Sequence, residues 1–478
     1  MSRVPLLDKN LGMDERGRGM RETLTIAERY SALSYENLTS NSLRKAKECI
    51  LDYLGCTYAG LSFESTQILR GFALGTYGQG NCTIIGRKER LVPPGACFVN
   101  STTGHAPELD DTSNEGGVHA GVVLIPVALA MAETLGASGE ALLTGVVVGY
   151  DVDIKVGKAA NPEGLFQRGF HPTALCGMFG AAMTAAYLMR LNSTQTANAL
   201  GIAGSYVAGN LECYSDGSLT KRLHPGIASS SGVTAATLAS KGYTGPKSIL
   251  EGPRGFFRTY CVNPRPDELK ESDVYEIEKI GLKPHACCRF NQPSIDAVLD
   301  ICSRNRIDPK HIATVEVELL KSAYDIVGQP AEIKFNPKNV VDAQFSVPYG
   351  VAIACIEGKA FLGEYTEATI RRQDVRELMK KITVKHAPDL DPFFPESIPS
   401  RVRITMSDGK SFVKEVRYAK GEFQNPLSWE EILQKFNALV PSSLLSEKRR
   451  KQLIETIQNL EEVEDIKELT ALLGEGAE

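Results

Sequence analysis

The stretch GEALLTGVVVGYDVDIKVGKA, residues 139–159, decides the fold class of this 478-residue chain. It is long, apolar and rich in Gly and Val. Three similar stretches surround it: SLRKAKECILDYLGCTYAG (42–60), GMFGAAMTAAYLMRL (177–191) and SGVTAATLASKG (231–242). In the first of these, the apolar residues recur at helical spacing. A glycine inside a helix costs about 1 kcal/mol relative to alanine. These glycines therefore predict helices that approach one another closely in a thick helical core.

The organisation of the chain changes along its length. From Leu24 to about Lys241 the sequence predicts one helix after another, whereas from Pro264 to about Phe423 helical pieces alternate with strand-like runs. One pair of runs, SRVRITMSDGKSFVKEVRYA (400–419), carries a hairpin turn signal at residues 407–409. The C-terminal stretch SWEEILQKFNALV is helical again and begins with a capping box of Ser428 and Glu431. We expect a separate α+β domain and C-terminal helices that pack back on the first region. The first twenty residues and the tail GEGAE are predicted to be loose.

Composition excludes several classes of function. A net charge of −5 gives no reason to expect nucleic acid as a partner. The most apolar run, VHAGVVLIPVALAMAETL (118–135), is interrupted by Pro126 and predicts a buried core helix instead of a membrane span. Eleven scattered cysteines without a CxxC pair favour a reducing cytosol and argue against a structural metal. No secretory signal opens the chain, so a cytoplasmic location is expected.

Histidines mark a candidate site. The chain has only seven, and four recur at the start of a small-residue or apolar stretch: His119, His171, His224 and His285. Proline follows His171 and His224 directly, which predicts that both lie at or near helix N-caps. A helix N-terminus attracts anions and disfavours imidazolium. Neutral imidazoles beside an anion are what proton transfer next to a carboxylate requires. A single histidine would merely cap its helix, but four such histidines favour a site.

Positive side chains accompany these histidines. Lys221 and Arg222 directly precede the His224 helix, among glycines that allow a ligand close to the backbone. Arg289 follows His285 and offers a bidentate fork for a carboxylate. We therefore favour carboxylate binding, or a catalytic ammonium at Lys221, over side chains that are merely solvated.

The acidic stretch HAPELDDTSNEGGVHAG (105–121) could hold a metal or support acid–base chemistry. If it is helical, Glu108 and Asp111 share a face and Asp110 points elsewhere. His105 and His119 are 14 residues apart with a flexible Gly-Gly between them, and no HExxH pattern fixes them. We predict no metal here, a structural role for His105, and a capping role for Asp111 or Thr112. The absence of GxGxxG, P-loop and GxSxG patterns argues against NAD, ATP and acyl-enzyme chemistry.

Together these motifs resemble the MmgE/PrpD family, which includes 2-methylcitrate dehydratase, cis-aconitate decarboxylase and iminodisuccinate epimerase. The matching pieces are ILDYLGCTYAG, HAPELDDT with VHAGVVLIP, GYDVDIKVGKA, GFHPTALCGMFGAA, DGSLTKRLHPGIASSSG, GPRGFF, KPHACCRF and QFSVPYGVA. The stretch DDTSNEGGVHA departs from the dehydratase branch, which carries Asn-Asp-Thr-Trp, so the substrate stays open.

The resemblance implies a mainly α fold. A large all-helical domain would be built from both chain ends, residues 1–265 and 423–478, and residues 266–422 would form an inserted, smaller α+β lid domain. It also implies a homodimer, a pocket between helical domain and lid, and no cofactor or metal. The family's site positions fall here on Glu108, Asp111, Thr112, His119, His171, Lys221 and His285.

Our hypothesis is a lyase that acts on a small di- or tricarboxylate by proton transfer alpha to a carboxylate. His119 and His171 would exchange the proton, Lys221 would bind the carboxylate and stabilise the enolate-like charge, and Asp111 would orient His119. The remaining expected substrate-binding residues are Glu108, Thr112, Arg222, His224 and, from the lid, His285 and Arg289. Dehydration is the first choice, decarboxylation a close second, and epimerisation a further alternative. A metal-dependent hydrolase and a non-catalytic carboxylate-binding protein are the rivals from other classes.

Overall fold

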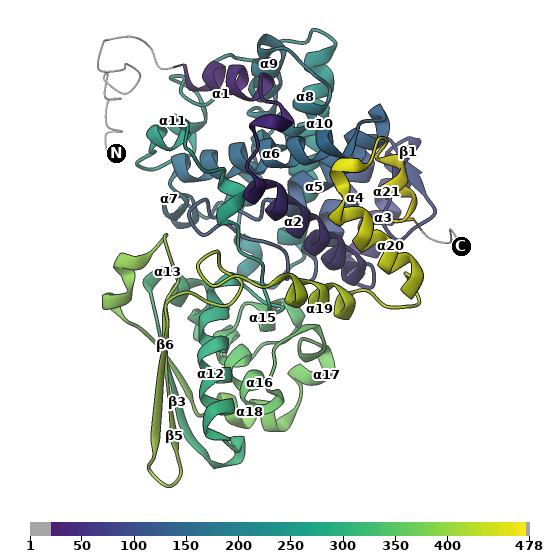
Figure 1. The fold of residues 1–478 in the computed structure, drawn as a ribbon. Coiled ribbons are helices and arrows are strands. Elements are labelled where there is room, and N and C mark those ends of the chain that lie inside the picture. The colour runs from purple at the N-terminus through teal and green to yellow at the C-terminus, as the bar shows by residue number, and fades with distance from the viewer. Residues whose placement is uncertain (1–20, 475–478) are drawn as a thin grey trace.

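The computed structural model describes residues 21–474 and is mainly helical (Figure 1). Of the ends that the sequence predicts to be loose, residues 1–20 and 475–478 lie outside the described residues. The helices of the first part are α1 (Glu22–Ser31), α2 (Ser40–Gly60), α3 (Glu64–Thr76), α4 (Pro93–His105), α5 (Gly121–Leu135), α6 (Gly139–Ala160), α7 (Pro162–Gln167), α8 (Pro172–Leu188), α9 (Ser193–Ala203), α10 (Thr220–Ser240) and α11 (Phe256–Thr259). As predicted, α5 is a buried core helix. No helix among residues 21–474 is long and apolar enough to cross a membrane.

Glycines allow the central helices to pack closely, as the sequence predicts. Helix α8 packs against both α6 and α10. A Cβ atom added at Gly149 of α6 would lie 2.1 Å from Oγ1 of Thr184 in α8, and one at Gly232 of α10 would lie 2.4 Å from Cβ of Ala181. No side chain fits at these distances. Close backbone approach therefore compensates the weak helix propensity of glycine.

The prediction that the first part is entirely helical is wrong at one place. Strands β1 (Gln79–Thr83) and β2 (Arg90–Leu91) form a two-stranded antiparallel sheet between α3 and α4. The pair is short and carries an irregular register between Gln79 and Cys82. It has no long run of alternating apolar residues, which is the signal that sequence reading depends on.

The second part contains a four-stranded mixed sheet. Its strands are β3 (Ile312–Leu319), β4 (Ile382–His386), β5 (Ser400–Met406) and β6 (Ser411–Val416), in the order β4-β3-β5-β6. Strands β3 and β4 are parallel, and the other two neighbouring pairs are antiparallel. The predicted hairpin is confirmed, with Gly409 at φ +87° in the turn. The helices of this part are α12 (Gln292–Asn305), α13 (Lys321–Ala323), α14 (Ala331–Lys334), α15 (Val340–Gln344), α16 (Val347–Glu357), α17 (Glu367–Ile370) and α18 (Gln373–Met379).

The C-terminal helices return to the first part, as expected. They are α19 (Trp429–Leu439), α20 (Glu447–Gln458) and α21 (Lys467–Ala471). Figure 1 shows α19 and α20 in yellow beside the purple α2, and α21 packs against α5. The predicted capping box of Ser428 and Glu431 begins α19. Buried Lys435 of α19 pairs with Asp52 of α2 at 2.6 Å and donates a hydrogen bond to the Leu109 carbonyl at 2.7 Å. The chain end therefore supports the acidic stretch directly.

Two separate hydrophobic clusters underlie the two parts. One joins the N-terminal and C-terminal helices, and the other joins the mixed sheet with α12 and α16. Leu269, Ile277, Ile280 and Leu282 belong to the first cluster, although the predicted lid begins at residue 266. We therefore propose that the lid begins after Leu282.

Candidate active site

A cavity of about 60 Å³ lies between the acidic stretch, the helix starts and the second part of the chain. Of the ten site residues that the sequence predicts, six line it: Glu108, Thr112, His119, His171, Lys221 and Arg289. The other four, Asp111, Arg222, His224 and His285, lie outside its wall.

The acidic stretch does not form the helix that was considered for it. Helix α4 ends at His105, and Glu108 takes a positive φ of +58° that turns the chain. As a result the Glu108 and Asp110 carboxylates both lie beside Lys283, whereas the Asp111 carboxylate points toward α5. The expectation that Glu108 and Asp111 share a face is therefore wrong, because it assumed helical spacing across this turn.

Lys221 connects this stretch to α10. Its ammonium group pairs with the Glu108 carboxylate and donates to Nε2 of His105 at 3.0 Å. Since Nε2 accepts this bond, Nδ1 of His105 carries the ring proton and donates to Asp110 at 2.7 Å. His105 is fully buried beneath the cavity and holds Lys221, in keeping with the structural role predicted for it.

Sequence reasoning missed Lys283. This lysine is fully buried, and its Nζ lies 3.3 Å from Asp110 and 3.6 Å from Glu108. Burial alone would raise the pKa of Glu108, but Lys221 and Lys283 outweigh it and hold that pKa well below its usual range. The signal for it is a lysine inside the otherwise largely apolar segment IGLKPHACC.

His119 is held as a neutral base. Its Nδ1 lies 2.9 Å from the Asp111 carbonyl and 3.2 Å from a carboxylate oxygen of Asp110. A carbonyl can only accept, so Nδ1 carries the proton and Nε2 has a free lone pair. Burial lowers the pKa of His119 to about 4, although Asp110 opposes this shift. The imidazole is therefore uncharged in the empty cavity at neutral pH.

His171 is the N-cap residue of α8, as predicted, and its Nδ1 lies 3.0 Å from Nδ1 of His224. Burial lowers the pKa of both rings, that of His224 to about 4. The prediction that His224 lies at a helix start is wrong, because α10 already begins at Thr220. Pro225 fits there since its missing N–H removes only one bond of the helix. His171 thus lines the cavity, and His224 contacts it from outside the cavity lining.

Asp111 positions its neighbours. Its carboxylate accepts hydrogen bonds from the backbone N–H of Gly121, at 2.9 Å, and from the Tyr150 hydroxyl, and thereby caps the start of α5. Burial raises the pKa of this carboxyl to about 7. Its carbonyl, and not its carboxylate, orients His119.

Arg289 reaches the cavity from the second part of the chain. It pairs with Glu422 at 2.5 Å and donates to the Asn114 side chain at 3.1 Å. Its buried Nη1 and the buried Oγ1 of Thr112 have no hydrogen-bond partner among the described residues, so both are available to a ligand. Arg222, in contrast, donates to Gln344 at 3.2 Å and lies over the Phe63 ring, outside the cavity wall.

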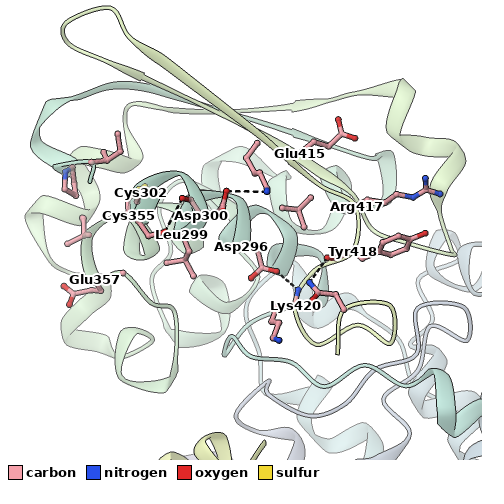
Figure 2. A pocket seen from close by; sticks show the side chains of 18 of the residues that line it. Asp296, Leu299, Asp300, Cys302, Cys355, Glu357, Glu415, Arg417, Tyr418 and Lys420 are labelled. Carbon is pink, nitrogen blue, oxygen red and sulfur yellow. Dashed lines mark hydrogen bonds and ion pairs between the residues drawn. The ribbon is translucent and has the colours of Figure 1, made fainter. Parts of the chain in front are cut away.

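The structure does not bring His285 to the cavity. Its Nε2 lies 2.9 Å from Asp296, which lines a wider groove of about 1020 Å³ beside α12 and β6 (Figure 2). The helix expected directly after His285 begins only at Gln292. Two other residues of this segment, Cys288 and Arg289, line the cavity instead of His285. In the groove, the acidic side chains already have partners: Asp300 pairs with Lys414 at 3.4 Å, and Asp296 accepts a hydrogen bond from the Lys420 backbone N–H. We therefore place the candidate active site in the cavity and not in the groove.

One group of side chains within residues 21–474 has the spacing of metal ligands. The ligand atoms of His105, Asp110 and His119 lie within 4.8 Å of one another. However, the Lys221 ammonium already occupies Nε2 of His105, and Lys283 lies against Asp110. Two ammonium groups at these positions disfavour a cation, so the arrangement fits an anionic ligand better.

Comparison with known proteins shows the family of this chain. Models of the MmgE/PrpD N-terminal and C-terminal domains match residues 24–269 and 285–462. The chain belongs to the MmgE/PrpD family. Cis-aconitate decarboxylases of this family are similar to it over most of their length. The Aspergillus terreus protein is 27% identical, and the match covers 93% of this chain and 94% of the relative. The mouse protein is 29% identical, with 92% of this chain and 91% of the relative covered. The human protein is 28% identical, with 94% of each chain covered. The chain is therefore an MmgE/PrpD family enzyme of the lyase type.

Proposed function

We propose that this protein is a cofactor-independent carboxy-lyase that removes CO2 from a small unsaturated carboxylate. The observation that carries the proposal is the ion-paired Lys221, which lines one cavity together with the neutral His119 and His171. Its relatives support loss of CO2 in particular, since cis-aconitate decarboxylases match it over more than 90% of its length.

The reaction needs a place for negative charge. When the bond to the leaving carboxylate breaks, CO2 departs and the electron pair stays on carbon. This carbanion delocalises onto a neighbouring carboxylate as an enolate-like charge. The Lys221 ammonium, the unpartnered Nη1 of Arg289 and the hydroxyl of Thr112 are donors that stabilise such a charge inside a buried cavity.

A proton must then reach the carbanion. His119 is neutral in the empty cavity, but a bound carboxylate substrate adds negative charge beside it and favours imidazolium. We propose that His119 takes up a proton as substrate binds and delivers it from Nε2 to carbon, which completes the new C–H bond. His171 and His224 form a second neutral pair that exchanges protons with the site.

Loss of water is the second candidate, although the sequence alone ranks it first. The lone pair on Nε2 of His119 favours it, because a neutral base is what abstraction of a proton alpha to a carboxylate requires. The two reactions differ in their products, so product analysis separates them.

The proposal is tested by proton and carbon NMR of the purified protein with cis-aconitate, citrate, 2-methylcitrate and alkyl-substituted relatives, with and without EDTA. We expect release of CO2 from an unsaturated acid, one deuterium incorporated from D2O, and no effect of EDTA. Water loss from a hydroxy acid without CO2 would instead identify a hydro-lyase. No reaction of any of these acids, or activity that EDTA removes, would contradict the proposal.

A further inference from the structure

The cavity has two unlike sides. The side described above presents Lys221, Arg289, Thr112 and the histidines. Elsewhere the lining mixes Ser113, Asn114, Tyr214 and Cys288 with six apolar side chains, most of them from the second part of the chain: Phe166, Phe290, Ile326, Phe345, Phe394 and Ile398. We call these six the apolar wall.

This apolar wall is well packed. Phe290, Phe345 and Ile398 are at most 7% exposed, and the Phe290 and Phe394 rings lie 6.2 Å apart. The Phe345 ring lies under the Lys221 ammonium, 5.1 Å from it, at the border between the two sides. None of these six side chains offers a nitrogen or an oxygen atom. A carboxylate placed against them would lose its water and gain no hydrogen bond, which is unfavourable.

The charges of the polar side are already balanced within the protein. Lys221 and Lys283 face Glu108 and Asp110, and Arg289 faces Glu422. In the proposed reaction His119 takes up one proton as substrate binds, so this side gains one positive charge. A substrate with three carboxylates would bring more negative charge than this cavity compensates.

We infer that the substrate is a carboxylic acid with an alkyl or aryl substituent, and not a compact tricarboxylate. Its carboxylate end lies at Lys221, Arg289 and Thr112, and its apolar end lies against the wall formed by Phe290, Phe394 and their neighbours. This inference rests on the proposed lyase function for the reaction, but it concerns binding and can fail separately.

A series of 2-substituted maleates tests the inference by titration calorimetry on the full chain. Cis-aconitate is maleate with a carboxymethyl substituent, and methyl-, propyl- and pentylmaleate replace the third carboxylate with an alkyl chain. We expect affinity to rise about fourfold for each methylene that becomes buried, which corresponds to about 0.8 kcal/mol. Cis-aconitate should bind more weakly than pentylmaleate. Equal affinities along the series, tightest binding of cis-aconitate, or no binding at all would overturn the inference.

A pair of variants locates the effect. Ile326→Lys places an ammonium group in the apolar wall, so it should weaken binding of pentylmaleate at least tenfold and strengthen binding of cis-aconitate. Val413→Lys, at a 48% exposed position of β6 outside the cavity lining, should change neither affinity. An Ile326→Lys protein with the wild-type preference would show that the substituent does not contact this wall. Alkylmaleates that bind in the expected order, in a protein that transforms none of the acids screened by NMR, would contradict the lyase function and leave the binding inference standing.

Discussion

His119 is the residue whose protonation connects the geometry of the cavity with its chemistry. The Asp111 carbonyl fixes its tautomer, and burial lowers its pKa to about 4. In a decarboxylation that begins with proton uptake, kcat/KM depends on the protonated fraction of the free enzyme. Above the pKa of His119 that fraction decreases about tenfold per pH unit.

We therefore predict that kcat/KM decreases as pH rises from about 7 to about 9, where substrate carboxyl groups are fully ionised. A pH series of initial rates measures this. A His119→Gln variant with residual activity should lose the slope. If kcat/KM of the wild type is constant over this range, His119 acts as a base in the free enzyme, and elimination of water becomes the better assignment.

At this scale the sequence predicted six residues of the cavity lining and missed Lys283, which lies behind them. His119, His171, Lys221 and Glu108 were found because they lie in distinctive local patterns. Lys283 and the orientation of Asp110 were missed because both depend on a turn at Glu108 and on contacts between distant segments. His285 was predicted from the same local pattern and from the family resemblance, but Cys288 and Arg289 of its segment line the cavity instead.

At the scale of the elements, packing between α6 and α8 fixes the position of two histidines, His171 before α8 and His119 before α5. Helix α8 begins directly after His171, and Thr173 of its first turn accepts the backbone N–H of His119 at 3.0 Å. The glycines of 139–159 predicted this close packing, since small residues are what such an approach requires.

A matched pair of alanine substitutions tests the role of these glycines. Gly149→Ala should lower the free energy of unfolding by about 1 to 3 kcal/mol, because the new methyl group collides with Thr184. Gly71→Ala in α3, where a Cβ atom meets nothing within 4 Å, should raise it by up to about 1 kcal/mol. Urea unfolding measures both values. A Gly149→Ala protein as stable as Gly71→Ala would show that the α6–α8 contact does not depend on glycine.

At the scale of the whole molecule, the cavity is assembled from parts of the chain that are far apart in sequence. The acidic stretch and Lys221 lie more than 100 residues apart, Arg289 and the apolar wall come from the second part, and Lys435 supports Leu109 from the C-terminal helices. Periodicity predicted the helical class, the hairpin and the return of the chain end. It could not predict which side chains of these parts meet, because that is decided by tertiary contacts.

The central claim is that this cavity stabilises negative charge through Lys221 during loss of CO2. Its most direct test is the kcat of Lys221→Met, with Lys241→Met at the exposed end of α10 as control and the unfolding temperature of each variant as a check of the fold. We predict that kcat of Lys221→Met decreases by about 100- to 1000-fold, as expected for loss of one donor to a developing anion, while Lys241→Met keeps the wild-type value. A folded Lys221→Met protein with wild-type kcat would contradict the claim.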